Sequence, residues 1–240
     1  MQKLSVIIPA FNEAHRIQKT LLSVSEFLKK QPYESEILVV SDGSKDNTVE
    51  VVNSLKNQIP NLSVIANQEN HGKGWVTKQG MLAATGDIRL FMDADNSTTI
   101  DQVVPMQALL EKDFDLVIGS IEVAGAKINE HAQWYRRAIG HWSKYLIRLV
   151  ANLWDIHDTQ RGFKLFSKSA AERIFPQMTI SRFGFDIEIL AIAKKLRMKV
   201  KEVPVIWNNE GESKVSLNSY IATLVDLFRI RWNLWTNKYE

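Results

Sequence analysis

The sequence predicts an α/β fold in which a mostly parallel sheet is flanked by helices. Short runs rich in β-branched residues recur along the chain, helical patterns separate them, and turn-forming residues follow them. The 240 residues are 45% hydrophobic and 24% charged, which suits one folded domain with an appended segment. The expected strands are Leu4–Ile8, Ile37–Val40, Leu62–Ala66, Ile88–Met92 and Leu116–Ile118.

The connection after the first expected strand has a helical period. Apolar residues recur there at i, i+4, i+7 and i+11, which predicts a helix whose apolar stripe lies on the sheet. These residues are Ile17, Leu21, Val24 and Leu28. Asn12 is placed to cap this helix. Residues 41–47 are rich in turn formers, so a second helix is expected from about Thr48.

The pattern changes after Ser120. Residues 121–135 predict a flexible connection, and a helix over Arg136–Leu153 follows. The remaining expected elements are a loop entering a short strand over Asp158–Phe166, a helix over Asp186–Lys195, a strand over Val200–Trp207 with an edge or bend at Pro204, and a final helix from about Asn218.

The charge is unevenly distributed. Residues 1–120 carry 11 Lys/Arg and 15 Asp/Glu (net −4), and residues 121–240 carry 19 and 12 (net +7). An acidic half suits a metal ion, and a basic half suits phosphates or an anionic membrane surface, although drift of surface charge is an alternative. The chain has no cysteine, which excludes disulfides and thiolate zinc sites. The start lacks the pattern of a signal peptide and no run of 18 apolar residues occurs, so a cytoplasmic location without a membrane span is expected.

Two expected helices place aromatic residues beside cations. Residues 136–153 carry an apolar face beside a basic stripe, formed by Ala138, Trp142, Tyr145, Leu149 and Leu153 and by Arg137, His141, Lys144 and Arg148. The final helix carries a stripe of Ile221, Val225, Phe228, Trp232, Trp235 and Tyr239 beside Arg229 and Arg231. This pairing is typical of a membrane surface and argues against nucleic-acid binding. The alternative is that the final stripe packs on the domain or forms a dimer seam.

Acidic residues follow the expected strands. Ligands bind open α/β sheets at the carboxyl ends of strands, so Pro9–Glu13, Asp42 and Asp93–Asp95 should converge there. Asp93-Ala94-Asp95 places two carboxylates within reach of one ion, and hard oxygen ligands suit Mg²⁺ or Mn²⁺ bridging a diphosphate. A solvated turn is the alternative interpretation of this motif taken alone.

A glycine-containing segment, Asn70-His71-Gly72-Lys73-Gly74, precedes the expected fourth strand. Its glycines would let the backbone approach a nucleotide while Lys73 or Lys78 meets the phosphate charge. The full P-loop pattern is missing, so a P-loop NTPase is not predicted, and a simple turn is an equal alternative.

These strings, in order, resemble the family-2 inverting glycosyltransferases. The resemblance rests on Val6-Ile7-Ile8-Pro9-Ala10-Phe11-Asn12-Glu13, Val39-Val40-Ser41-Asp42-Gly43-Ser44-Lys45-Asp46-Asn47-Thr48, His71-Gly72-Lys73-Gly74 and Phe91-Met92-Asp93-Ala94-Asp95. Later strings are similar to the dolichyl- and polyprenyl-phosphate sugar synthases: Asp158-Thr159-Gln160-Arg161-Gly162-Phe163-Lys164-Leu165-Phe166, Phe183-Gly184-Phe185-Asp186-Ile187-Glu188 and Glu210-Gly211-Glu212-Ser213-Lys214. The dolichyl-phosphate β-glucosyltransferase branch is the most similar, through Phe185-Asp186-x-Glu188 and Val203-Pro204-Val205-x-Trp207.

The resemblance implies a GT-A fold, a nucleotide-sugar donor and a role for each matching residue. It places the donor at Pro9, Phe11, Glu13, Asp42 and Asp93. It makes Asp95 the principal metal ligand, with Asp93 by the metal or ribose. It assigns the acceptor phosphate to Arg136 or Arg137, Arg148 and Lys214. The halves 1–120 and 121–217 would then bind donor and acceptor within one catalytic domain, followed by an amphipathic helix over 218–240.

Three positions depart from the pattern that the resemblance implies. Ser41 stands where many relatives have Asp, which leaves base recognition there open. Arg161 stands where Ser or Cys is common and adds a charge near the expected cleft. Asn208 stands where mannosyl-type relatives carry Arg, which favours UDP-glucose over GDP-mannose.

The expected reaction is transfer of a sugar, with inversion, from a nucleotide diphosphate to a polyprenyl or dolichyl phosphate. The acceptor phosphate is already an anion, so the protein's tasks are positioning and neutralising the leaving diphosphate. Asp186 is a candidate to contact sugar or acceptor, as is Glu188, unless both only complement a helix dipole. The alternatives are transfer to a glycan hydroxyl, use of GDP-mannose, and a nucleotide-binding module without turnover. A peripheral location on the cytoplasmic face of a membrane is expected.

Overall fold

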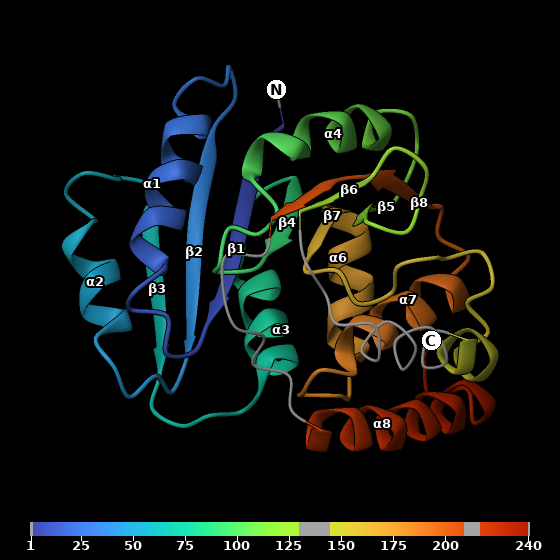
Figure 1. Ribbon diagram of the computed structural model, residues 1–240. Coiled ribbons are helices and arrows are strands. Elements are labelled where there is room, and N and C mark those ends of the chain that lie inside the picture. The colour runs from blue at the N-terminus through green and yellow to red at the C-terminus, as the bar shows by residue number, and fades with distance from the viewer. Residues whose placement is uncertain (1, 130–144, 209–216, 240) are drawn as a thin grey trace.

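The computed structural model describes residues 2–129, 145–208 and 217–239. Seven strands form one sheet in the order β3-β2-β1-β4-β7-β5-β8 (Figure 1). Their bounds are β1 Leu4–Ala10, β2 Ser35–Asp42, β3 Leu62–Asn67, β4 Ile88–Met92, β5 Leu116–Ser120, β7 Phe163–Ser167 and β8 Val200–Pro204. A second, two-stranded sheet pairs β6 Lys127–Asn129 with β9 Ile206–Asn208.

The sheet is mostly parallel, as predicted, with one strand reversed. β1 pairs in parallel with β2 and β4, and β2 with β3, while β5 pairs in parallel with β8. β7 lies antiparallel between β4 and β5. A reversed strand begins at the edge where its neighbours end, so the loop before β7 reaches the carboxyl edge of β4. The predicted break near Pro204 is also present, because β8 ends there and β9 joins the other sheet.

The helices between the strands are α1 Ile17–Leu28, α2 Thr48–Ser54, α3 Lys73–Ala83, α4 Val104–Leu110, α6 Lys168–Ile174, α7 Phe185–Lys195 and α8 Leu217–Trp235. Two 3-10 turns, η1 Ile100–Val103 and η2 Phe175–Gln177, accompany them, and residues 145–151 are also helical. Of the predicted helix over Arg136–Leu153, the first part lies outside the described residues.

Two apolar cores cover the two faces of the sheet. Leu4, Val6 and Ile8 face one core together with the predicted stripe of α1, while Ile7 faces the other. This alternation is the period of two that a strand imposes on its side chains. The second core contains residues from α3, α6, α7, α8 and the helical segment 145–151. In Figure 1, α8 runs along the bottom of the molecule beneath α7, which it contacts.

The expected capping role of Asn12 is wrong. Asn12 has a positive φ of 53°, and its Oδ1 accepts a hydrogen bond from the backbone N–H of Lys45 at 2.8 Å. α1 begins only at Ile17, whose N–H donates to the carbonyl oxygen of Glu13 at 2.9 Å. Asn12 therefore joins the loop after β1 to the loop after β2 at the carboxyl edge of the sheet.

α8 has a buried face and an exposed apolar face. Leu227, Ile230 and Asn233 are buried, so these residues attach the helix to the domain. The predicted stripe lies on the exposed side, where Val225, Phe228, Trp232 and Trp235 are 63%, 69%, 59% and 74% exposed. The alternative that these four side chains pack on the domain is therefore wrong. None of the helices in the described part of the chain combines the length and the apolar character that crossing a membrane requires.

Tyr239 does not belong to that exposed stripe, because it is buried. Its hydroxyl donates to Glu188 Oε1 at 2.8 Å and accepts from Asn233 Nδ2 at 3.0 Å. Glu188 also accepts from the backbone N–H groups of Thr179 and Ile180. Burial, and after it the charge of Glu188, raises the pKa of the Tyr239 phenol far above its usual value, so the hydroxyl remains a donor. This network fastens the end of the chain to α7.

We expect Tyr239→Phe to lower the free energy of unfolding by about 1–3 kcal/mol, because it removes the two buried hydrogen bonds that the phenol makes with Asn233 and Glu188. Urea denaturation measures the change. Tyr145→Phe, at a tyrosine that is 54% exposed, is the matched control and should unfold like the wild type. Equal midpoints for the two variants would show that the network does not contribute to stability.

Candidate active site

The predicted residues at the strand ends lie together on adjacent strands. Glu13 follows β1, Asp42 ends β2, and Asp93 and Asp95 follow β4, and these three strands are neighbours in the order β2-β1-β4. The parallel registers of β1 with β2 and of β1 with β4 place their ends at the same edge. The expected convergence at this edge is confirmed by the topology.

Asp42 shapes the loop that leads into α3. Its buried carboxylate accepts hydrogen bonds from Asn70 Nδ2 at 2.9 Å, from the His71 N–H at 2.7 Å and from the Gly72 N–H at 2.9 Å. Gly72 has a φ of +102°, and a β-carbon there would overlap the Ser181 carbonyl oxygen, so the loop requires glycine at this position. Asp42 thus holds the Gly72–Gly74 segment against the sheet edge.

The other residues expected at the donor site differ in exposure. Pro9 is buried within β1, where it pairs with Val40, whereas Phe11 is 39% exposed at the edge. Glu13 is nearly buried and accepts two hydrogen bonds from the Arg16 guanidinium, at 2.8 and 2.9 Å. Phe11 is therefore the most accessible of the three side chains to a nucleotide.

Lys73 and Lys78, both proposed for phosphate, have different surroundings. Lys78 Nζ donates to the carbonyl oxygens of Pro176 and Met178, each at 3.0 Å, so it ties α3 to η2. We correct its expected role on this ground. Lys73 Nζ instead lies 2.6 Å from Asp93 Oδ1, and 5.5 Å from the centroid of the Phe91 ring.

The charges around Lys73 are mostly negative. Burial lowers the pKa of its ammonium, but Asp93, Asp186 and Asp95 outweigh this effect, and the pKa is raised. A lysine that remains charged between carboxylates is an available partner for an incoming diphosphate. Its Asp93 contact is partly exposed, with side-chain exposures of 27% for Lys73 and 36% for Asp93.

Asp93 lies against the loop before β7. Its N–H donates to the Gly162 carbonyl oxygen at 3.1 Å, and its carboxylate rests on the Gly162 backbone so closely that a β-carbon on Gly162 would overlap it. Asp95 Oδ1 accepts from the Ser97 N–H at 2.9 Å within the turn after β4. Both carboxylates are thus oriented by backbone contacts.

Sequence reasoning missed a buried lysine beside these carboxylates. Lys164 is fully buried, and its Nζ donates to the carbonyl oxygen of Arg161 at 2.6 Å and to the Asp186 carboxylate. The register of β4 and β7 sets Lys164 opposite Phe91, whose ring packs edge-on against Phe185 of α7 at 5.7 Å. Lys164 therefore points to the face that α7 covers. The available signal was a lysine in the middle of the apolar run FKLF.

Asp186 and Glu188 point from different sides of α7, Asp186 toward Lys164 and Glu188 toward Tyr239. Burial raises the pKa of the Asp186 carboxyl, an effect that Lys164 and then Lys73 only partly offset. Asp186 thus belongs to the same charged cluster as Lys73 and Asp93. Glu188 is fully buried in the network with Tyr239, in the first turn of α7, so the contacts described for it are structural.

The expected acceptor residues are only partly described. Arg136, Arg137 and Lys214 lie outside the described residues. Arg148 Nη2 donates to the His157 carbonyl oxygen at 3.2 Å, so part of its guanidinium holds the following turn.

The carboxylates of Asp93 and Asp95 fit a divalent ion of the Mg²⁺ or Mn²⁺ type. Both supply hard oxygen atoms, and the backbone contact of Asp95 uses one of its two oxygens. Within the described residues there is no cluster of three or more His, Cys, Asp or Glu side chains that could enclose a metal.

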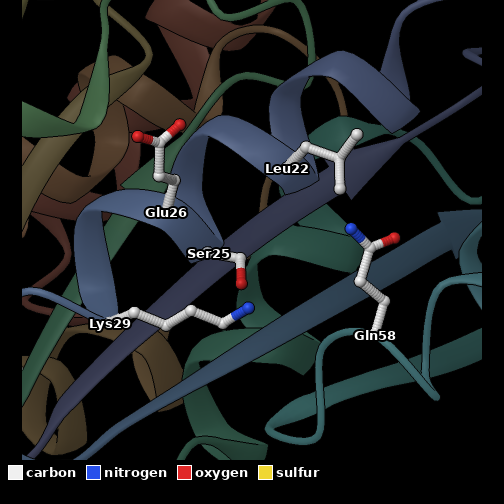
Figure 2. Close-up of a pocket in the computed structure, with 5 residues that line it drawn as sticks. All are labelled: Leu22, Ser25, Glu26, Lys29 and Gln58. Carbon is white, nitrogen blue, oxygen red and sulfur yellow. The ribbon is translucent and has the colours of Figure 1, made fainter.

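A hollow against α1 is unrelated to this edge (Figure 2). It is lined by Leu22, Ser25, Glu26, Lys29 and Gln58. α1 runs back from the carboxyl edge after β1, so the second half of the helix lies toward the opposite edge of the sheet. We assign no role to this hollow.

We expect Gly162→Ala to displace the Asp93 carboxylate, because the added methyl group would occupy its place. Binding of UDP with Mn²⁺, measured by calorimetry, should weaken about tenfold or more, while the thermal transition shifts little. Asp93→Asn should have a similar effect, and the double variant should lose no more than either single variant, since both act on one carboxylate. Additive losses would contradict this interpretation.

The chain matches a known family over most of its length. The model of "Glycosyl transferase family 2" matches residues 5–175, most of the chain. A dolichyl-phosphate beta-glucosyltransferase of Trichomonas vaginalis is 34% identical over 97% of this chain and 75% of its own length. The enzyme of that name from Drosophila melanogaster is 34% identical over 95% of this chain and 74% of its own length, and the human one is 28% identical over 100% and 78%.

Solved structures share the fold. Glucosyl-3-phosphoglycerate synthase from Mycobacterium tuberculosis, in complex with Mn²⁺, UDP-glucose and phosphoglyceric acid, superposes with a TM-score of 0.71. The match covers 96% of this chain and 80% of the synthase at 17% identity, so it supports the GT-A fold. Together with the residues at the sheet edge, the family model and the curated relatives establish that this chain is a glycosyltransferase of family 2, related to the dolichyl-phosphate beta-glucosyltransferases.

Proposed function

We propose that this enzyme transfers glucose from UDP-glucose to the phosphate of dolichol or another polyprenol, with inversion at the anomeric carbon. The observation that carries the proposal is the cluster of Lys73, Asp93, Asp95 and Asp186 at one sheet edge, in a chain related to dolichyl-phosphate beta-glucosyltransferases. The Mycobacterium tuberculosis synthase with the same fold was crystallised with UDP-glucose and Mn²⁺, which supports this donor and a divalent ion.

The donor side of the cluster would receive the diphosphate. Lys73 is placed to exchange its contact with Asp93 for one with a phosphate oxygen, and the exposed Phe11 is placed to meet the base. Asp93 and Asp95 would hold Mg²⁺ or Mn²⁺, which when bound acts as a Lewis acid toward the leaving diphosphate. Asp42 acts indirectly, by holding the loop that carries Lys73.

In the transfer, an oxygen of the acceptor phosphate donates an electron pair to the anomeric carbon. The bond from that carbon to the diphosphate oxygen breaks, and its electrons leave with UDP. The phosphate is ionised at neutral pH, so no side chain has to remove a proton. Asp186, held by Lys164 and close in charge to Lys73 and Asp93, would contact the sugar between donor and acceptor.

The exposed aromatic residues would bring the enzyme to its lipid. Trp232 and Trp235 of α8 form an edge-on pair at 5.4 Å, and Tyr145 and Trp154 form another at 5.6 Å. Both helical segments pack on the same apolar core, through Ile230 in α8 and through Ile147 and Ala151 in residues 145–151. Exposed Arg229 and Arg231 would add attraction to an anionic leaflet, about 1 kcal/mol each. We propose peripheral binding to the cytoplasmic face of a membrane.

The activity is tested with labelled UDP-glucose, GDP-mannose, polyprenyl phosphate and a divalent ion, followed by extraction of the lipid phase. UDP-glucose should label the lipid. EDTA should abolish labelling, and Asp95→Asn should lower the rate about a hundredfold or more, since it removes a group that stabilises the leaving charge. Labelling by GDP-mannose alone, transfer to a glycan hydroxyl alone, or no turnover would each contradict the proposal.

Membrane binding is tested by flotation with anionic vesicles. The wild type should float at low salt and be partly released at high salt, whereas Trp232→Ser with Trp235→Ser should stay folded and unbound. Leu82→Ser, at an exposed apolar residue of α3, is the control and should float like the wild type. A folded double variant that still floats would place the contact elsewhere.

A further inference from the structure

Arg161 presents a restrained guanidinium in the loop before β7. Its Nε lies 3.4 Å from Asp158 Oδ2, and its guanidinium carbon lies 4.8 Å from the centroid of the Trp207 ring on β9. The side chain is 18% exposed. Within the described part of the chain, the guanidinium makes only these two contacts. Its terminal nitrogens Nη1 and Nη2 have no hydrogen-bond partner among the described residues.

The loop that contains Arg161 contacts two members of the charged cluster, Lys164 and Asp93. The Arg161 carbonyl oxygen accepts a hydrogen bond from Lys164 Nζ. The Asp93 carboxylate lies against the backbone of the adjacent Gly162. Trp207 is followed by Asn208, whose N–H donates at 2.8 Å to the carbonyl oxygen of Ser97, two residues after Asp95. The backbone of Arg161 and the ring under its side chain are therefore both tied to the turn that carries the two carboxylates.

The strand order separates Arg161 from the donor loops. Asp42 ends β2, which lies on one side of β4 beyond β1, whereas Arg161 precedes β7, the neighbour of β4 on the other side. A donor diphosphate that contacts Lys73 and Asp93 would leave the side of β7 for the second substrate. Arg161 thus stands on the acceptor side of Asp93.

We propose that Arg161 binds the phosphate of the acceptor through Nη1 and Nη2, an inference that rests on the proposed transfer to a phosphate. A guanidinium offers two parallel N–H donors that match two phosphate oxygens, and a stack on an aromatic ring fixes its plane. Asp158 contacts Nε, and the edge of the guanidinium formed by Nη1 and Nη2 stays available for the ligand. The chemistry that Arg161 recognises is a phosphate monoester, carried by a lipid or by a soluble acceptor.

The test measures two affinities in the same protein by calorimetry: that for a short-chain prenyl phosphate in the presence of UDP and Mn²⁺, and that for UDP with Mn²⁺ alone. Arg161→Met should weaken prenyl phosphate binding about tenfold to a hundredfold, the range expected for a charge-assisted contact, and change UDP binding less than about twofold. The prenyl phosphate affinity of Arg161→Lys should lie between those of the wild type and Arg161→Met, because lysine keeps the positive charge but loses the two parallel N–H donors of the guanidinium. Arg173→Met, at an exposed arginine of α6, is the matched control and should change neither affinity.

Inorganic phosphate and a water-soluble sugar phosphate distinguish the sources of the ligand. Competition by both in the wild type, lost in Arg161→Met, supports recognition of the phosphate itself. Unchanged prenyl phosphate affinity in a folded Arg161→Met, or an equal loss of UDP affinity, would overturn the inference. If Arg161→Met does not fold, wild-type affinity in Arg161→Lys would overturn it instead. A wild type that binds prenyl phosphate but transfers no sugar would contradict the proposed function alone.

Discussion

The charged cluster of this enzyme is organised around an ammonium group buried in the middle of its sheet. Lys164 comes from β7, the reversed strand between β4 and β5, and it is surrounded by oxygen acceptors of Asp186 and Arg161. A buried charge without a partner is strongly unfavourable, so Asp186 and the α7 helix that carries it must remain beside the sheet. The residue just before this strand is Gly162, whose backbone lies against the Asp93 carboxylate. One reversed strand therefore positions carboxylates from two separate elements.

Local patterns predicted much of this molecule. The strands, the stripe of α1 and the placement of Asp42 and Asp93 at one sheet edge follow from side-chain period and from the rule that ligands gather at the carboxyl ends of parallel strands. The contacts that the sequence did not reveal join distant positions. Lys164 meets Asp186 22 residues away, and Glu188 meets Tyr239 51 residues away. Such partners depend on the register of β7 and on the docking of α8, and neither leaves a local signal.

In α8, the spacing of apolar residues predicts a helix but not which of its faces is buried. Its apolar residues occupy more than one face, so the pattern predicts an amphipathic helix without deciding which face is covered. Here the narrower face of Leu227 and Ile230 is buried, while Phe228 and Trp232 are exposed. Tyr239 lies beyond the helical end at Trp235 and turns into the core, where extrapolation of the helical stripe placed it outside. Hydrophobicity alone also could not assign Lys78, because its carbonyl partners come from η2.

The hydrogen bond from the Ile121 N–H to Asp158 Oδ2, at 3.1 Å, closes a long excursion of the chain. The chain leaves the sheet at the end of β5 and re-enters it at β7, and Asp158 holds the two ends together beside the cluster. Of the residues between these two ends, the structure describes 122–129 and 145–157, and β6 within them pairs with β9 rather than with the main sheet. Ile147 and Ala151 of this stretch pack in the same core as α7, so a change in the segment would reach the helix that carries Asp186.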